Sequence, residues 1–283
     1  MAFKTLKFNP VWFRTLSLSL KVSLLIVLIF AFILLWGLAQ IPSDKKIRGC
    51  MTTNLYKVYL CPGSESYTRI SNISQSLQKA VVLTEDSSFW THQGFDLQEM
   101  QNSLKANLEK GRYARGGSTI TQQLAKNLFL SKEKTLTRKL LEAVITVRLE
   151  KTLSKKEILE RYLNVVQFGK DIFGIKKAAQ FYFNKTPANL SIVESAFLTF
   201  LLPSPEVYSQ SFYKKRLTAF AQNRLSTIID RLYQYNRISE DEYVTAKADL
   251  EYFLTGKEPP VIDPSVEFID EEDALIYDEE ATD

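Results

Sequence analysis

The helical spacing of apolar residues is the feature that most limits how this 283-residue chain can fold. From Gln75 onward no segment alternates between apolar and polar residues as a half-buried strand would. Four stripes at helical spacing are Leu97, Met100, Leu104 and Leu108; Ile120, Leu124 and Leu128; Leu136, Leu140, Val144 and Val147; and Ile158, Leu159, Tyr162 and Leu163. The ten glycines are also few for an all-β protein. The chain is therefore predicted to be mainly α.

Several helix starts are marked by capping boxes, in which a Ser precedes a Glu by three residues. Such boxes begin at Ser154, Ser191 and Ser239. Between the last two, the sequence predicts one long basic helix from Tyr213 to Leu232.

An apolar run near the N-terminus, Val22–Ala39, has Ser23 as its only clearly polar residue. It is close to the roughly 20 residues that a membrane-spanning helix needs. A cleavable signal peptide is the alternative, but its apolar core is usually shorter, about 7–15 residues. We expect a transmembrane anchor at 22–41, preceded by a basic cytoplasmic tail at 1–21.

The segment 42–74 is expected to be an irregular linker, with a short strand near Leu55–Leu60, that leads to a helical domain at 75–257. Its two cysteines, Cys50 and Cys61, could form a local disulfide on an oxidising side of the membrane. Two free thiols are the alternative.

The net charge of +4 hides an uneven distribution. From Pro259 onward the chain has no Lys or Arg, and we expect a disordered acidic tail at 258–283. The rest of the chain is basic, which suits an anionic partner such as a membrane surface, a phosphate or a pyrophosphate. A membrane anchor argues against nucleic acid. With a single histidine, a zinc site built on several His is excluded, and catalysis would rest on carboxylates with Lys and Arg.

The run Thr84–Asp96 concentrates polar and aromatic side chains where a predicted helix ends. It contains Glu85, Asp86 and His92, the only histidine of the chain. A carboxylate at a helix end can face a cleft, so Glu85 is a candidate catalytic base.

The run Gly116–Asn127 places two glycines before Ser118, which we expect to be the N-cap of a helix. Free backbone N–H groups at a helix start can bind an anion, and Arg115 and Lys126 would add positive charge. The alternative is a capped helix with a polar outer face.

Two further runs are less distinctive on their own. Arg138 and Glu142 could form a surface ion pair worth about 0.3–0.5 kcal/mol, or line a half-buried groove. The run Lys155–Gly169 reads as an ordinary capped helix.

Together the four runs resemble the motifs of the peptidoglycan glycosyltransferases, glycosyltransferase family 51. The matching motifs are E-D-x-x-F-x-x-H-x-G at 85–94, G-G-S-T-I-T-Q-Q-x-x-K-N at 116–127, R-K-x-x-E at 138–142 and K-x-x-I-L-E-x-Y-L-N-x-x-x-x-G at 155–169. A weaker fifth match lies near Ala196–Pro205. The resemblance implies a lysozyme-like, two-lobed helical domain.

The resemblance also implies roles for individual residues. Glu85 would be the general base, and Glu142 would hold the cations of the site or a divalent metal, Mg or Mn, on a pyrophosphate. Lys126, Arg138 and Lys139 would stabilise the leaving pyrophosphate, and Lys110–Gly117 would be a mobile loop. The residues expected to line the site are Ser118, Thr119, Gln122, Gln123 and Arg115. Those expected to support it are Asp86, Phe89, His92, Gly94, Asn127, Tyr162 and Asn164.

Members of this family join lipid II to a growing lipid-linked glycan, forming β-1,4 bonds with inversion and releasing polyprenyl pyrophosphate. The implied partners are these substrates, membrane lipids and other cell-wall synthesis proteins, without an organic cofactor. The implied location is the bacterial inner membrane, with the catalytic domain on the extracytoplasmic side. We expect no transpeptidase domain, because the chain has no Lys-Thr-Gly triplet.

Two other functions remain open from the sequence. A glycan hydrolase or lytic transglycosylase also uses a Glu in a helical fold. A membrane-tethered scaffold could bind lipid II without catalysis.

Overall fold

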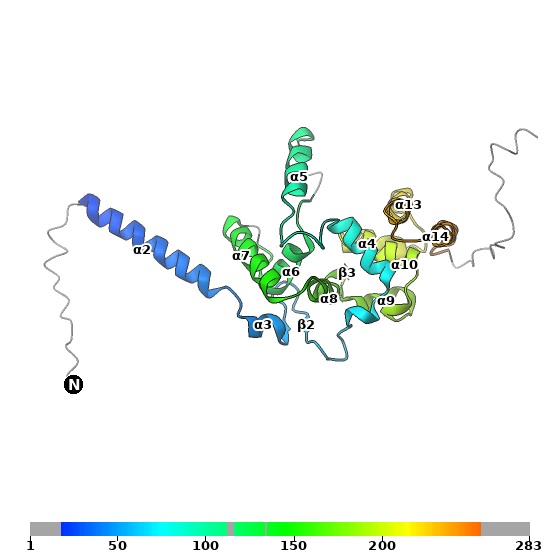
Figure 1. The fold of residues 1–283 in the computed structure, drawn as a ribbon, viewed down its shortest axis with the longest axis horizontal. Coiled ribbons are helices and arrows are strands. Elements are labelled where there is room, and N and C mark those ends of the chain that lie inside the picture. Colours follow the sequence, from blue (N-terminus) through cyan, green and yellow to red (C-terminus); the bar gives the residue numbers. More distant parts are fainter. Residues whose placement is uncertain (1–17, 112–115, 134, 256–283) are drawn as a thin grey trace, which may run out of the picture.

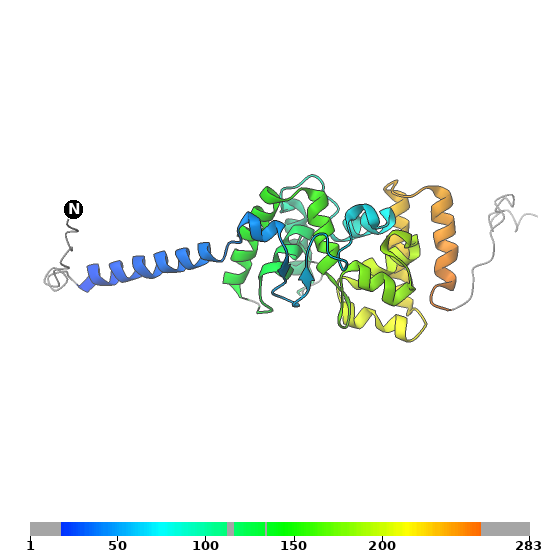
Figure 2. The same cartoon turned by 90° about the horizontal axis from the view of Figure 1, so that it is seen from below.

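The computed structural model describes residues 18–111, 116–133 and 135–255. Most of the predicted basic tail, half of the expected mobile loop, including Arg115, and the predicted acidic tail lie outside the described residues. The predicted mainly helical fold is confirmed, because only short strands occur among the described residues. Figures 1 and 2 show the helices of the domain gathered in two groups, and α4 belongs to the group of α10 and α13.

The elements follow one another in the order of the chain. They are α2 (Leu18–Ala39), α3 (Asp44–Arg48), β1 (Met51–Thr52), β2 (Tyr59–Leu60), η1 (Ile70–Asn72), α4 (Gln75–Glu85), α5 (Leu97–Glu109), α6 (Ile120–Phe129), α7 (Leu136–Thr152), α8 (Lys155–Val165), β3 (Gln167–Gly169), β4 (Ile172–Phe173), α9 (Ile175–Phe183), η2 (Pro187–Asn189), α10 (Ile192–Leu201), α11 (Pro205–Tyr208), α12 (Gln210–Tyr213), α13 (Ala219–Gln234) and α14 (Glu240–Tyr252). The strands pair antiparallel as β1–β2 and β3–β4.

The core of the domain is formed within both groups of helices. In one group α6 packs against α7 and α8, and in the other α4 and α13 pack against α10. The predicted inward stripe of α8 is confirmed, since Ile158, Leu159, Tyr162 and Leu163 are all fully buried. Capping boxes fix the starts of α8, α10 and α14, as the sequence predicts.

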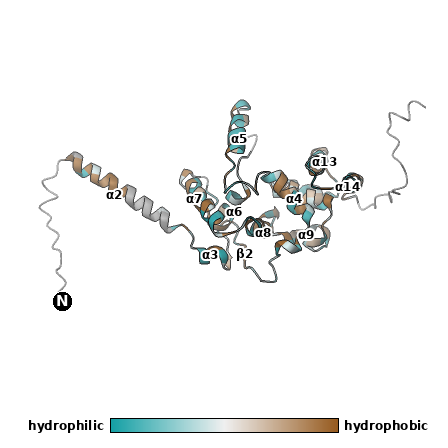
Figure 3. Ribbon diagram, viewed as in Figure 1, coloured by the Kyte–Doolittle hydropathy of each residue, from teal (hydrophilic) through white to brown (hydrophobic). Residues whose placement is uncertain are grey.

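The apolar stripes of α5 and α7 are exposed. On α5, Leu104 and Leu108 are 61% and 73% exposed, and on α7, Leu136 and Leu140 are 86% and 70% exposed. Figure 1 shows α5 standing away from the other helices, and Figure 3 shows hydrophobic residues beside hydrophilic ones along α7. Helical spacing therefore located these two helices, but the two predicted stripes are not part of the core, and α7 buries Ile145 and Leu149 instead.

The predicted anchor falls on α2, which leads away from the domain (Figure 2). Several of its side chains, including those at 30–36, lie outside the description. Within the part of the chain that is described, no helix meets the length and hydropathy needed to cross a membrane. The anchor at 22–41 therefore remains a prediction.

The segment expected to be an irregular linker is packed onto the domain instead. In α3, Ile47 is fully buried, and Asp44 accepts a hydrogen bond from Thr152 Oγ1 at 2.7 Å. Of the expected strand near Leu55–Leu60, only Tyr59 and Leu60 are in strand conformation, where they pair with β1. The buried residues and polar contacts of this segment attach it to α7 and α8.

A disulfide joins Cys50 to Cys61 across the β1–β2 hairpin. The turn of this hairpin contacts the end of α6, where Asn54 N donates to Leu128 O at 2.9 Å and Leu55 N donates to Asn127 O at 3.3 Å. The hairpin therefore buttresses the helix that carries Lys126.

Replacing Cys50 and Cys61 together with Ser should lower the free energy of unfolding by about 2–4 kcal/mol, because the cross-link restricts the unfolded chain. Urea unfolding with and without a reductant measures this. The reductant should destabilise the wild type and leave the double variant unchanged. Equal stability of the two proteins without reductant would contradict the prediction.

The predicted long helix from Tyr213 to Leu232 is confirmed from Ala219 onward, where α13 lies, but its predicted start is wrong. The chain leaves helical geometry after α12, where Lys215 has a φ of +51°. It then re-enters a helix at Thr218, whose side chain accepts a hydrogen bond from Ala221 N. A left-handed residue and a new N-cap therefore separate α12, which ends at Tyr213, from α13, which starts at Ala219.

Candidate active site

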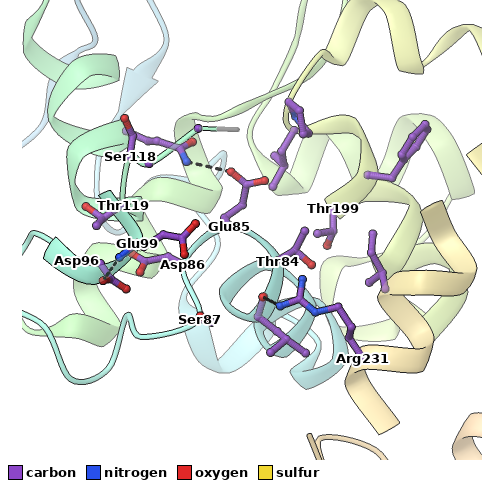
Figure 4. A pocket seen from close by; sticks show the side chains of 18 of the residues that line it. Thr84, Glu85, Asp86, Ser87, Asp96, Glu99, Ser118, Thr119, Thr199 and Arg231 are labelled. Carbon is purple, nitrogen blue, oxygen red and sulfur yellow. Dashed lines mark hydrogen bonds between the residues drawn. The ribbon is translucent and has the colours of Figure 1, made fainter. Parts of the chain in front are cut away.

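A cavity of about 930 Å³ lies between the two groups of helices. Its walls come from the end of α4, α5, the segment before α6, α6 itself, α10, α11 and α13. In Figure 4, Ser118 and Thr119 lie on one side of Glu85, and Thr199 and Arg231 lie on the other. Glu85 and Lys126 both line this cavity.

Glu85 is the last residue of α4, and its carboxylate is held by a pair of hydrogen-bonded side chains. Gln123 Nε2 donates to Glu85 Oε2 at 2.9 Å. The amide of Gln123 is itself oriented, because Tyr162 Oη donates to its Oε1 at 3.0 Å. Burial raises the pKa of Glu85, while the Gln123 hydrogen bond and the charge of Lys126 lower it. The group is therefore a carboxylate whose proton affinity is increased by its surroundings.

Asp86 and His92 join the end of α4 to the start of α6. Asp86 Oδ2 accepts from Ile120 N at 2.9 Å, and His92 Nε2 lies 2.8 Å from Asp86 Oδ1. Gly94 N donates to His92 Nδ1 at 3.0 Å, so Nδ1 is the acceptor and Nε2 carries the proton. These contacts fix the loop that follows Glu85.

Gly94 occupies a position that a larger residue cannot fill. Its φ is +96°, and a Cβ would lie 2.8 Å from Thr146 Cγ2. Its carbonyl also accepts a hydrogen bond from Thr119 Oγ1 at 2.7 Å, which links the loop to α6.

Gly94→Ala should lower the free energy of unfolding by about 1–3 kcal/mol, through backbone strain, with the clash adding to it. Gly111→Ala is the matched control, because Gly111 has a φ of +59° but no atom of the described residues within 4 Å of its Cβ position. Denaturant unfolding should show a larger loss for the change at Gly94. An equal loss in the two variants would mean that the contact with Thr146 is unimportant.

The N-cap of α6 is Thr119, not Ser118 as the sequence predicts. Thr119 Oγ1 accepts from Gln122 N, and Gln122 Oε1 accepts from Thr119 N at 3.0 Å. Because this capping box uses Gln122, that side chain is buried and is not among the residues lining the cavity. Ser118 and Thr119 do line it.

Lys126 connects the cavity to a cluster of charges on α7. Burial lowers the pKa of Lys126, the charge of Glu142 raises it, and the charges of Arg138 and Lys139 lower it. Glu142 is 3% exposed and accepts from Lys139 Nζ and, at 3.5 Å, from Arg138 Nη1. The pair of Arg138 and Glu142 is therefore half-buried, because the Glu142 side chain is buried and Arg138 is partly exposed. Arg138, Lys139 and Glu142 are not among the residues that line the cavity.

The charged cluster suits an anion better than a metal ion held by the protein. Both oxygens of Glu142 already accept from cations, and within the described ranges no group of three or more His, Cys, Asp or Glu could hold a metal. The buried Nε of Arg138 has no partner among the described residues, which leaves one donor of the cluster available.

The remaining predicted support residues hold the surrounding elements together. Phe89 is fully buried, with Lys155 Nζ 4.7 Å from its ring centre. Asn164 accepts from Thr68 N and donates to Thr68 O, both at 2.8 Å. The backbone carbonyl of Asn127 accepts a hydrogen bond from Leu55 N in the β1–β2 hairpin.

The sequence motifs miss one wall of the cavity. The residues of this wall are Thr199, Phe200, Leu202, Pro203, Tyr208, Arg224, Ile228 and Arg231. Only the weak match near Ala196–Pro205 pointed to part of it. No sequence signal distinguishes Arg224 and Arg231 from the basic residues just before their helix, Lys214, Lys215 and Arg216.

Residues 54–233 match the family model described as Transglycosylase. The chain belongs to the transglycosylase family. The matched range covers α4, α6, α7 and α8, which carry the four motifs, and nearly all of α13.

Curated members of the transglycosylase family resemble this chain over most of its helical domain. The proteins named biosynthetic peptidoglycan transglycosylase from Nitrosomonas eutropha and Alcanivorax borkumensis are 47% and 49% identical to it over 156 residues, or 55% of this chain. These matches cover 64% and 62% of the two relatives, less than two thirds of their length. A protein of the same name from Dechloromonas aromatica is 37% identical over 203 residues, covering 71% of this chain and 87% of the relative.

Proposed function

We propose that this transglycosylase polymerises lipid II into glycan strands by inverting glycosyl transfer. The observation that carries the proposal is that Glu85 and Lys126 line one cavity. A base for the attacking hydroxyl and a cation for the leaving pyrophosphate are the two groups that such a transfer needs. The names of the relatives, which specify peptidoglycan, support this substrate class.

In the proposed reaction, Glu85 removes the proton from the 4-hydroxyl of an incoming lipid II. The oxygen forms the new β-1,4 bond at the anomeric carbon of the growing strand. The bond between that carbon and the pyrophosphate breaks, and the electron pair leaves with polyprenyl pyrophosphate. Lys126 stabilises the negative charge that develops there, and Arg138 and Lys139 add positive charge behind it.

Glu142 is proposed to keep these cations in place. Without its charge, Arg138, Lys139 and Lys126 would repel one another in a poorly solvated site. The unpartnered Nε of Arg138 supports an anionic ligand. A Mg or Mn ion carried by the pyrophosphate stays a prediction, and polymerisation assays with and without EDTA test it.

We further propose that the protein works at a membrane surface, on the extracytoplasmic side of the bacterial inner membrane. The exposed apolar residues of α5 and α7 and the apolar run Val22–Ala39 support contact with lipid. The disulfide supports an oxidising compartment. Contacts with other cell-wall synthesis proteins stay a prediction.

Incubating the full chain separately with lipid II and with finished peptidoglycan tests the proposal. The expected result is that lipid II is converted into polymer while finished strands keep their length. Shortening of finished strands would instead indicate a glycan hydrolase or lytic transglycosylase. Binding of lipid II without polymer would indicate a scaffold.

A further inference from the structure

Arg231 links α13 to the end of the helix that carries Glu85. Its Nη2 donates to the backbone carbonyl of Leu83 at 3.0 Å, although the two residues are 148 positions apart in sequence. Arg231 is half-buried and lines the same cavity as Glu85. Figure 4 shows it next to Thr84, on the side of Glu85 opposite to Ser118 and Thr119.

The carbonyl that Arg231 binds lies in the last turn of α4. Carbonyls in a last turn have no partner within their own helix and carry partial negative charge, so a guanidinium is a favourable partner. Leu83 is buried against the core but is also among the residues that line the cavity, so Arg231 holds α4 at the edge of the cavity itself. Glu85 follows two residues later, in the same turn.

We propose that Arg231 is a positioning residue for Glu85, holding the last turn of α4 against α13 so that the carboxylate meets the acceptor hydroxyl. This inference rests on the proposed function, because the acceptor hydroxyl belongs to lipid II. The inference gives the wall of α10 and α13 a role in catalysis. The sequence motifs do not predict such a role for this wall.

The contact acts through geometry and not through the charge of the arginine. The groups that shift the pKa of Glu85 are its buried surroundings, Gln123, Asp86 and Lys126, and Arg231 is not among them. Removing Arg231 should therefore leave the protonation of Glu85 unchanged. It should instead make the backbone of the last turn of α4, which carries Glu85, more mobile.

The chain offers a matched control on the same helix. Lys79 Nζ donates to the backbone carbonyl of Arg237 at 2.8 Å, which also joins α4 to the region of α13. Lys79 lies six positions before Glu85 and does not line the cavity. Lys79→Met therefore removes a more exposed bond between the same parts of the fold, away from the carboxylate.

The experiment compares wild type, Arg231→Met, Arg231→Lys and Lys79→Met in lipid II polymerisation. Small misplacements of reacting groups can reduce rates by about 100-fold, so we expect Arg231→Met to lower kcat by about 10–100-fold with KM unchanged. Arg231→Lys should restore part of the rate, since it keeps a donor, and Lys79→Met should match the wild type. The acidic limb of the pH profile should stay in place in all four proteins.

Three outcomes would overturn the inference. The first is a higher KM with unchanged kcat in Arg231→Met. The second is an equal fall in kcat in Arg231→Met and Lys79→Met. The third is that neither kcat nor KM changes in Arg231→Met. The first would make Arg231 a substrate-binding residue, and the second would make its effect one of general packing.

Amide hydrogen exchange separates this inference from the proposed function. Exchange in the last turn of α4 should be faster in Arg231→Met than in wild type, and unchanged in Lys79→Met. If the wild type forms no polymer, the proposed function is refuted. The difference in amide exchange between wild type and Arg231→Met can still be measured in that case. Unchanged exchange in Arg231→Met would refute the positioning role even if the wild type polymerises lipid II.

Discussion

Glu85→Gln should reduce the rate of lipid II polymerisation by about 10²–10⁴-fold, the usual contribution of a general base. The amide can still accept the hydrogen bond from Gln123 Nε2, so the shape of the site is kept. It cannot take the proton from the acceptor hydroxyl. Initial rates of polymer formation at saturating lipid II measure the loss.

The stability of the same variant is its control. Burial raises the pKa of Glu85 in the folded protein, so the charged carboxylate lowers folding stability at pH values above that raised pKa. Glu85→Gln should therefore unfold at a Tm at or above that of the wild type at neutral pH, and the gain should vanish in acid. A variant that folds normally and polymerises at nearly the wild-type rate would exclude Glu85 as the base.

Lys126→Met should lower kcat by about 10²–10³-fold, as removal of one preorganised group that stabilises developing charge typically does. Lys126 is the member of the charged cluster that lines the cavity, whereas Arg138, Lys139 and Glu142 act on it from behind. Steady-state polymerisation at saturating lipid II measures kcat.

Lys185→Met is a suitable control for this change. Lys185 pairs with Glu194 at 2.9 Å and is not among the residues that line the cavity. Its replacement removes a lysine and an ion pair and should leave kcat unchanged. If Lys126→Met and Lys185→Met gave the same rate, Lys126 would have no role in the departure of the pyrophosphate.

The sequence motifs predicted only one side of the cavity, the side whose residues stand close together in distinctive short runs of sequence. Glu85 and Lys126 stand in runs that are unusually rich in polar residues, and both residues line the cavity. Arg231 sits in a basic helix where any arginine could be solvated. Its contact with Leu83 spans 148 positions, and only the tertiary fold brings the two residues together.

The apolar stripes show a second limit of sequence analysis. Periodicity identifies one face of a helix but does not say what covers that face. The stripe of α8 is buried in the core, while those of α5 and α7 are exposed. The sequence pattern is similar in the three helices, so the difference depends on where the helices lie.

Local geometry explains the smaller differences between the predicted and the observed structure. Ser118 and Thr119 are both good N-caps, and the helix starts after Thr119 because Gln122 completes a capping box there. The turn at Lys215 carries no glycine to mark its positive φ, so the break before α13 has no sequence signal. The β1–β2 hairpin is too short to show alternation, and its disulfide was one of two open alternatives.

The pH dependence of kcat/KM in wild type and Gln123→Leu tests most directly whether Glu85 is the base. The base form is lost as the pH falls through the raised pKa of Glu85, so the wild-type rate should decline at a pH above 4.5, the ordinary value for Glu. The Gln123 hydrogen bond lowers that pKa, so the decline should move to still higher pH in Gln123→Leu. A decline at or below 4.5, or one at the same pH in both proteins, would contradict the assignment of Glu85 as the catalytic base.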